Sequence, residues 1–232
     1  MTIIYEERSS DSPYVDTIMH GWTVRDGSTI RPAGINLHMV FEKHNGRVQP
    51  IFVGPLTTAG VASWGKGAEI LWIRFKLGTF MPHLPTRDFL DVETYLPGAA
   101  SQSFWLKGAA WEFPNYDNTE TFINRLVRED ILVCDPVVNA ALQDQLPEMS
   151  LRTVRHRFLR ATGVSQSHIW QIERAQRAET LLKQGVSILD TVHELGYFDQ
   201  PHLTRSLKQS IGHTPTQIID APAQTIRLSQ HE

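Results

Sequence analysis

Apolar and polar residues alternate through much of the first half of the chain, in the manner of β-strands. Segments 35–55, 69–78 and 102–108 contain short runs rich in Val, Ile, Phe and Trp, with Gly and Pro between them. Two of these runs flank Asn45-Gly46. An Asn-Gly pair is a strong hairpin signal because both turn residues adopt positive φ. The pattern therefore predicts a β-rich region from about residue 30 to residue 112.

From about Thr119 onward the spacing of apolar residues becomes helical. Phe122 and Leu126 fall on one side of a predicted helix, for which Asn118 or Thr119 is available as the N-cap. Pro and Asn interrupt both patterns in segment 112–118. The predicted fold class is α+β with two domains. The predicted boundaries are a β-rich domain at 1–114, a helical domain at 115–221 and a C-terminal tail at 222–232. Because the helical domain has its own apolar stripes, we expect fragment 115–221 to fold and bind DNA alone.

The helical region contains one pattern twice, at 150–163 and at 199–212. Corresponding positions carry similar residues: Ser150 and Asp199 as N-caps, Val154 and Leu203, Phe158 and Leu207, and a closing Gly163 and Gly212. In the second copy Pro201 also marks the first turn of the helix, where its missing N–H is tolerated. A short predicted helix precedes each copy, at 135–146 and 187–195. This order predicts two helix-turn-helix units.

The second helix of each predicted unit has an apolar stripe and a polar face, at about 100° per residue. The predicted stripes are Leu203, Leu207 and Ile211 in the second unit and Leu151, Val154 and Phe158 in the first. The opposite faces carry His202, Arg205, Lys208 and Gln209 in the second unit, and Arg152, Thr153, His156 and Arg160 in the first, with Arg155 at the flank. One such basic face is typical of solvated helix surface, whereas two with the same layout favour a binding surface.

A predicted helix at 166–184, ending at Gly185, joins the two units. Its length of about 28 Å would hold the two recognition helices about 34 Å apart, which is one turn of B-DNA. The spacing predicts that both helices enter successive major grooves on one side of the duplex.

The net charge of the 232-residue chain is −3, which alone argues mildly against a nucleic-acid partner. Residues 150–215, however, contain nine Lys/Arg against five Asp/Glu, a local charge of +4 that is typical of phosphate binding. The single Cys134 fits a reducing compartment. No stretch resembles a signal peptide or approaches the ~20 apolar residues of a membrane helix. We therefore expect a cytoplasmic protein without a membrane partner.

Other residues with ligand chemistry have ordinary explanations that we prefer. His38, Glu42 and His44 share one face of a predicted strand and could hold a divalent ion, but a solvated strand face beside a turn is the favoured interpretation. Five tryptophans could line a pocket, although core packing is favoured: Trp22, Trp64, Trp72, Trp105 and Trp111. No catalytic, metal or cofactor site is predicted.

Segments "RTVRHRFLRATGVS" (152–165) and "QIERAQRAETLLKQGVSILDTVHELGYFDQPHLTRSLKQSIGHTP" (171–215) resemble the DNA-binding domain of the AraC/XylS family of bacterial transcription regulators. The resemblance implies seven helices, sequence-specific binding to promoter DNA and usually a separate regulatory domain in the same chain, and a regulator of this kind needs no enzymatic residues. The base-contacting positions that it implies are Arg152, Arg155 and His156, with Gln200, Pro201, His202, Thr204 and Arg205. His156 stands where the family often has Arg, and Pro201 cannot donate a hydrogen bond. Lys208 is better placed for a phosphate.

The segments "RPAGINLHMVF", "WIRFKLGTF" and "FWLKGAAWEFP" resemble the β-rich, cupin-like regulatory domain found in one branch of this family. The leading hypothesis is a transcription regulator controlled by an effector or by dimerisation through this domain. The candidate partners besides double-stranded promoter DNA are RNA polymerase, a small-molecule effector and a second copy of the chain. Two alternatives remain open: a metal-dependent cupin-type enzyme fused to a DNA-binding domain, and an effector-independent DNA binder.

Overall fold

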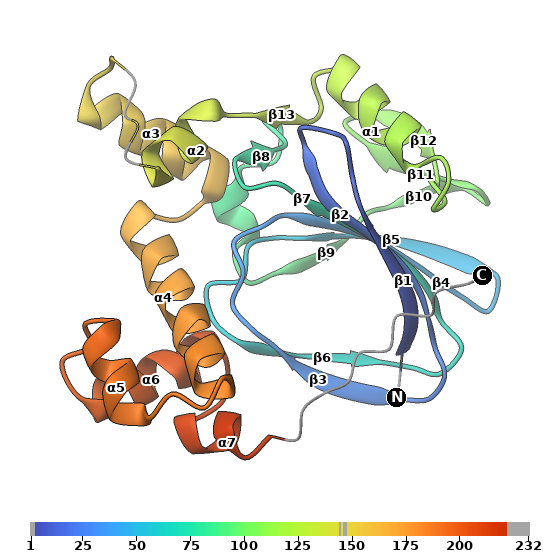
Figure 1. Ribbon diagram of the computed structural model, residues 1–232. Helices are drawn as coiled ribbons and strands as arrows, with labels where there is room; N and C mark the ends of the chain where they lie inside the picture. Colours follow the sequence, from blue (N-terminus) through green and yellow to red (C-terminus); the bar gives the residue numbers. More distant parts are fainter. Residues whose placement is uncertain (1–2, 144, 146–147, 222–232) are drawn as a thin grey trace.

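The computed structural model describes residues 3–143, 145 and 148–221, so the predicted tail at 222–232 lies outside the described residues. A β-rich region over residues 3–112 is followed by a region with seven α-helices, which confirms the two-domain α+β prediction. Figure 1 shows the strands on one side and helices α2 to α7 along the other. The cupin-like assignment stays a prediction.

The largest sheet has six antiparallel strands in the order β1-β2-β7-β4-β5-β9. Their bounds are β1 (Ile3–Ser9), β2 (Val15–Thr23), β4 (His38–His44), β5 (Arg47–Val53), β7 (Glu69–Phe75) and β9 (Glu93–Tyr95). The hairpin between β4 and β5 turns at Asn45 and Gly46, which have φ values of 51° and 76°. The prediction of a hairpin at this Asn-Gly pair is therefore confirmed.

Smaller β-elements surround this sheet. A ribbon pairs β3 (Gly27–Arg31) with β6 (Gly60–Trp64), and a three-stranded sheet joins β10 (Gly98–Ala100), β11 (Ser103–Leu106) and β12 (Ala109–Glu112). A short 3-10 helix, η1 (Thr86–Phe89), follows β8 (Thr79–Phe80). Strand β8 pairs with β13 (Val133–Cys134), which lies between helices α1 and α2. Residues between α1 and α2 thus add a strand that pairs with the β-rich region.

The helices begin and end close to the predicted positions. Their bounds are α1 (Thr119–Arg128), α2 (Pro136–Leu142), α3 (Leu151–Thr162), α4 (Gln166–Lys183), α5 (Ile188–Glu194), α6 (Gln200–Ser210) and α7 (Pro215–Ile219). The side chains of Asp135, Ser150 and Asp199 accept hydrogen bonds from backbone amides in the first turns of α2, α3 and α6. Gly185 has a φ of 88°, so it ends α4 in the left-handed conformation that favours glycine.

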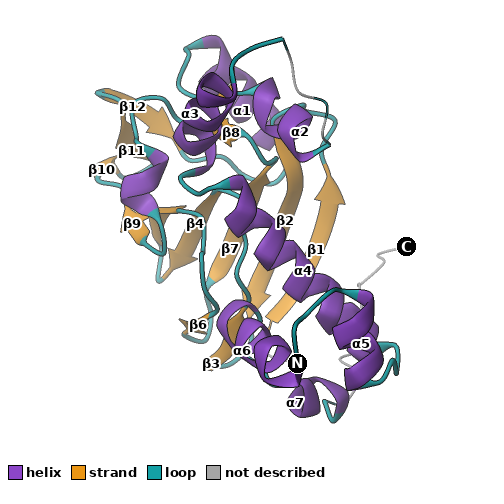
Figure 2. Ribbon diagram, turned by 90° about the vertical axis from the view of Figure 1, so that its left-hand side faces the viewer, coloured by secondary structure: helices purple, strands orange, loops and turns teal. Residues whose placement is uncertain are grey.

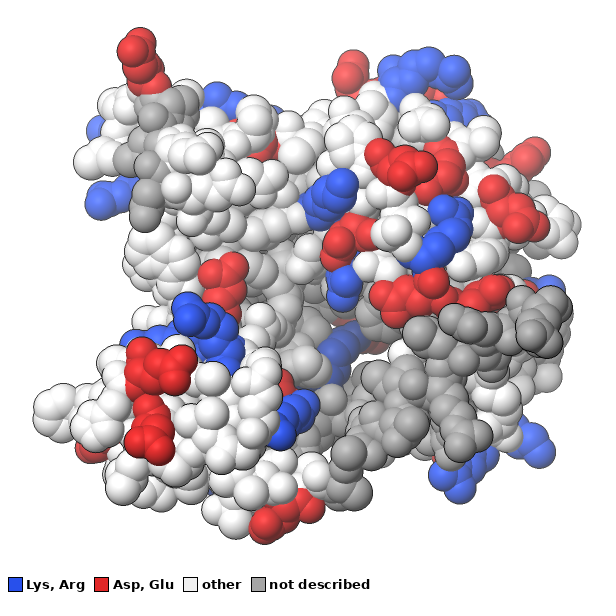
Figure 3. All heavy atoms as spheres, in the orientation of Figure 1, with Lys and Arg blue, Asp and Glu red and all other residues white. Residues whose placement is uncertain are grey.

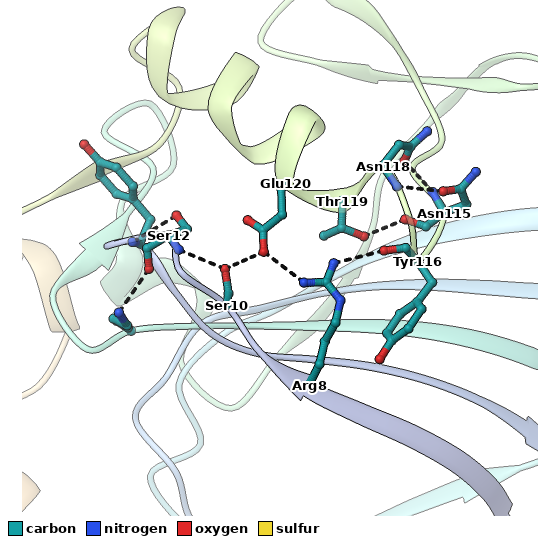
Figure 4. Close-up of polar contacts among 10 residues, drawn as sticks. Arg8, Ser10, Ser12, Asn115, Tyr116, Asn118, Thr119 and Glu120 are labelled. Carbon is teal, nitrogen blue, oxygen red and sulfur yellow. Dashed lines mark hydrogen bonds and ion pairs between the residues drawn. The ribbon is translucent and has the colours of Figure 1, made fainter. Parts of the chain in front are cut away.

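A polar network ties strand β1 to the start of α1, as Figure 4 shows. Glu120 accepts hydrogen bonds from Arg8 Nη1 at 3.1 Å and from Ser10 Oγ at 2.7 Å. Arg8 Nη2 also donates to the Tyr116 carbonyl at 3.1 Å. Asn118 is the N-cap residue of α1, but its side chain accepts from the preceding loop instead of from the helix. Contacts with β1 therefore fix this end of α1.

One large apolar core serves both regions of the chain. It runs from the sheet, represented by Met39 and Ile73, through Trp111 and α1 to Phe158 of α3 and Ile172 of α4. A separate smaller core is made by the second half of α4 with α5, α6 and α7. The first predicted helix-turn-helix unit therefore shares its core with the strands, whereas the second has its own.

The tryptophans differ widely in burial. Trp111 is fully buried in the large core, as predicted. Trp22 and Trp105 are 43% and 45% exposed, so the core assignment is wrong for these two residues. Trp105 alternates with buried Phe104 and Leu106 along β11, and the period of a strand therefore turns its ring outward.

Candidate DNA-binding surface

The start of α6 is fixed by the residues that precede it. Asp199 Oδ1 accepts a hydrogen bond from the His202 amide at 2.7 Å, and Pro201 occupies the second position of the helix. Leu203 and Leu207 are fully buried in the smaller core, and Ile211 at the C-cap is 2% exposed. The predicted apolar stripe is therefore confirmed, and the opposite face of α6 is left toward solvent.

The predicted contact residues on α6 differ in exposure. Gln200, Pro201, Arg205 and Lys208 are exposed, whereas His202 and Thr204 are half-buried. The His202 ring lies edge-on to Tyr197 at 5.2 Å between centroids, and its Nδ1 accepts from the Phe198 amide at 3.4 Å. His202 thus also holds the turn between α5 and α6. Its ability to contact a base is correspondingly restricted.

On α3 the polar face is exposed, as on α6. Val154 and Phe158 are buried, and the exposed predicted residues are Arg152, Thr153, Arg155, His156 and Arg160. Leu151, which the helical pattern placed inward, is 61% exposed, so this assignment is wrong. The reason is that packing against the shared core begins at Val154, beyond the first helical residue.

Two arginines of α3 are engaged by neighbouring elements. The Arg157 guanidinium donates from Nε and Nη2 to the two oxygens of Asp135 at 2.9 and 2.8 Å, which is a bidentate pair. The Arg160 guanidinium lies 5.6 Å from the centroid of the Phe80 ring on β8. Arg152 and Arg155 are consequently the better candidates on α3 for contacts with DNA.

Helix α4 separates the two exposed faces. Figure 2 shows α3 and α6 toward opposite ends of α4, on the same side of the large sheet. At 1.5 Å per residue, the 18 residues of α4 span about 27 Å. Figure 3 shows acidic side chains interspersed with Lys and Arg over the helices at the left of the view, so positive charge does not cover this whole face.

The helices α3 and α6 also contact the β-region, which the sequence did not predict. The Ala33 amide donates to the Ser210 carbonyl at 2.6 Å, and the Ala59 amide donates to the Gln209 carbonyl at 2.7 Å. These carbonyls belong to the last turn of α6, where helical partners are missing. Backbone amides beside the β3–β6 ribbon therefore cap the C-terminal end of α6. Pairs so distant in sequence leave no local signal.

The histidines of the candidate metal cluster have other partners. His38 Nδ1 accepts from Trp72 Nε1 at 2.8 Å, and burial lowers the pKa of His38 to about 3, so the ring is neutral. His44 Nε2 lies 3.1 Å from the Lys66 carbonyl. Among the residues that the structure describes, no three His, Cys, Asp or Glu are grouped so that they could hold a metal ion. In the same part of the chain, every helix is too short or too polar to cross a membrane.

Comparison with known families matches residues 147–221 to the model of a helix-turn-helix domain of the AraC type. The matched segment contains α3 to α7 and excludes α1 and α2. Comparisons with curated proteins and with solved structures gave no match. The C-terminal third of this chain is thus an AraC-type domain that binds double-stranded DNA, and the chain is a DNA-binding transcription regulator.

Proposed function

We propose that the protein binds promoter DNA sequence-specifically through two helix-turn-helix units, α2–α3 and α5–α6, whose second helices enter successive major grooves. The observation that carries this proposal is the equivalent exposure of the polar faces of α3 and α6 on either side of α4. The local charge of +4 over residues 150–215 supports phosphate binding along the same surface.

Individual side chains have distinct proposed roles. Arg205 lies opposite the buried Leu203 and Leu207, so its guanidinium can reach the O6 and N7 acceptors of a guanine. Lys208 lies further along the helix and contacts a phosphate. On α3, Arg152, Arg155 and His156 contact bases, and the imidazole is a weaker partner for guanine than a guanidinium. The remaining proposed contacts are Thr153, Arg160, Gln200, Pro201, His202 and Thr204.

The β-rich region controls DNA binding in this proposal, either by taking up a small effector or by dimerisation. The shared core and the amides that cap α6 support such control, because they join the β-region to both recognition helices. RNA polymerase is the proposed further partner at the promoter. No observation on the described residues favours an enzymatic role for the β-region.

The proposal is tested by selecting binding sequences from a random duplex library with the full chain, followed by footprinting. Two protected blocks about 10 base pairs apart are expected, because α4 holds the two recognition helices about one turn of DNA apart. A single short block would contradict the role of two units. Loss of that block in Arg205→Ala, or its survival, would then show which unit binds.

A further inference from the structure

A cavity of about 370 Å³ lies where the β3–β6 ribbon meets the segment after η1. Its polar lining residues are Arg31, Thr58, Ser63, Asp91 and Glu93, and Ala59 lies beside them. Cavities that bind small molecules have volumes of about 300–1,000 Å³. This one therefore suits a compact ligand, and its lining suits a ligand with several polar groups.

Arg31 provides the positive charge of this cavity. Its Nη1 pairs with Glu93 Oε1 at 2.7 Å. Its Nε is buried and has no hydrogen-bond partner among the described residues. Nε itself has no surface that a ligand could reach. The Arg31 side chain is 20% exposed where it lines the cavity, so its other N–H groups can pair with a ligand carboxylate.

Asp91 provides negative charge at the same cavity. Its backbone has a φ of 59°, in the left-handed region that Asp and Asn adopt more readily than other non-glycine residues. Its carboxylate accepts from the Thr57 amide at 2.6 Å and from the Thr57 hydroxyl, which holds it in place. With Glu93, the cavity has two carboxylates to one guanidinium. A ligand with only negative charge would therefore be repelled.

We propose that this cavity binds a small zwitterion of the α-amino acid class. The ligand's carboxylate pairs with Arg31, its ammonium group lies toward Asp91 and Glu93, and Thr58 and Ser63 offer hydroxyls to its side chain. Both charges of the ligand then have a partner, which a simple carboxylic acid or a simple amine would not achieve.

The same cavity is linked to α6 through the backbone. Ala59 lines the cavity, and its amide donates to the Gln209 carbonyl in the last turn of α6. A ligand that fixes segment 57–60 therefore also fixes the group that caps this helix. The regulatory consequence rests on the proposed function, in which α6 contacts DNA, whereas ligand binding does not depend on it.

Binding is tested by calorimetry and thermal shift on the full chain with each natural α-amino acid. For any that binds, the matched desamino acid and the matched amine are compared. We expect at least one amino acid to bind and both analogues to bind at least about tenfold more weakly, since each lacks one charge pair. Absence of binding by every amino acid, or equal binding of the desamino analogue, would overturn the proposal.

Variants locate the site. Arg31→Lys retains a cation for Glu93 but removes the planar set of guanidinium donors, and it should weaken binding about tenfold or more. Asp91→Asn removes one negative charge and should weaken the amino acid more than its desamino analogue. Arg47→Lys, on an exposed position of the β4–β5 hairpin, is the matched control and should bind normally. Normal affinity in a folded Arg31→Lys protein would place the ligand elsewhere.

The link to α6 is tested with Ala59→Pro, which removes the amide that donates to Gln209. This variant should lose the effect of ligand on DNA affinity, measured at a ligand concentration that saturates the variant. Should it fail to fold, hydrogen exchange of α6 in the native chain must still slow when ligand binds. A chain that binds the amino acid but no DNA would contradict the proposed function only, and one that binds DNA but no amino acid would contradict this site only.

Discussion

The two proposed helix-turn-helix units have the same sequence pattern but different surroundings. In the first unit, Val154 and Phe158 of α3 pack into the large core that also contains the strands. In the second unit, Leu203 and Leu207 of α6 pack into a smaller core made only by α4 to α7. The amides of Ala33 and Ala59, beside the β3–β6 ribbon, donate backbone hydrogen bonds to α6.

A repeated local pattern does not imply equal dependence on the rest of the chain. N-caps, apolar spacing and a closing glycine determine where each helix begins and ends, and these are alike in both copies. The partner that covers the apolar stripe is set by tertiary structure. Stability of the first unit should therefore depend on the β-region, and that of the second should depend little on it.

The largest expected effect comes from removing residues 1–114. The sequence pattern predicts that fragment 115–221 folds and binds DNA, whereas the shared core predicts that only its second unit stays folded. Hydrogen exchange on the fragment should show protection in α4 to α7 and little in α2 and α3. Binding to DNA should persist at one block only. Equal protection of both units would contradict the dependence proposed here and support the independent domain.

The next largest effects are expected from truncating core residues, and they should differ between the two units. Phe158→Ala should cost about 3–5 kcal/mol of unfolding free energy, because it leaves a cavity in the core that serves both regions. Leu207→Ala should cost about 2–5 kcal/mol but should lower hydrogen-exchange protection only in the second unit. Denaturant unfolding gives the energies. Lower hydrogen-exchange protection of the strands in Leu207→Ala would contradict the separation of the two cores.

The contribution of the contact between α6 and the ribbon is measured by a pair of glycine substitutions. Gly212 and Gly185 have φ values of 84° and 88°, so Ala should strain both by about 1–2 kcal/mol. A Cβ at Gly212 would lie 2.4 Å from Ile30 Cγ2, whereas one at Gly185 meets no atom within 4 Å. Gly212→Ala should therefore be the more destabilising. Equal losses of stability in the two variants would mean that the β3–β6 ribbon moves away from the new methyl group with no measurable loss of stability.

The smallest expected changes concern DNA contacts and leave stability intact. Arg205→Ala should cost about 1–3 kcal/mol on the selected site and relax preference at one base pair, whereas non-specific binding should change little. Arg152→Ala is the matched change in the first unit. Titrations of cognate, single-mismatch and random duplexes decide the outcome, since an equal loss on all three would make Arg205 a phosphate contact.

Lys208→Ala serves as the control for a phosphate contact. It should weaken binding to all duplexes alike and reduce the slope of log affinity against log salt by about one ion. Titrations at two salt concentrations measure that slope. A base-specific loss would instead assign Lys208 a role in sequence recognition.

Local features of this fold were predictable because their causes are local. The hairpin at Asn45-Gly46, the N-cap Asp199 and the stop at Gly185 each follow from the φ values or hydrogen bonds that those residue types favour. The exposure of Leu151 and the pairing of Arg157 with Asp135 were not predicted. Both depend on which part of the protein packs against α3, and helical periodicity carries no information about that.

The candidate DNA-binding surface likewise has some features that the sequence predicted and others that it did not. The polar faces of α3 and α6 follow from spacing, and the structure places them outward. The position of Arg160 beside Phe80 and the capping of α6 by Ala33 and Ala59 join residues far apart in the chain. Contacts of this kind depend on how the β-region packs against the helices, so they cannot be predicted from any one segment of the sequence.

The pairing of β13 with β8 has a consequence for protein engineering. A chimera that exchanges β-rich regions at the loop 112–118 would separate Val133 from Phe80, its neighbour in the antiparallel ladder. The same junction would divide the core that contains Phe158 between two unrelated parents. A junction within α4, between Ile172 and Ala175, would instead keep each of the two cores within sequence from one parent. The segment that can be exchanged with its own core intact therefore runs from Ala175 to the end of α7, and a graft should begin inside α4.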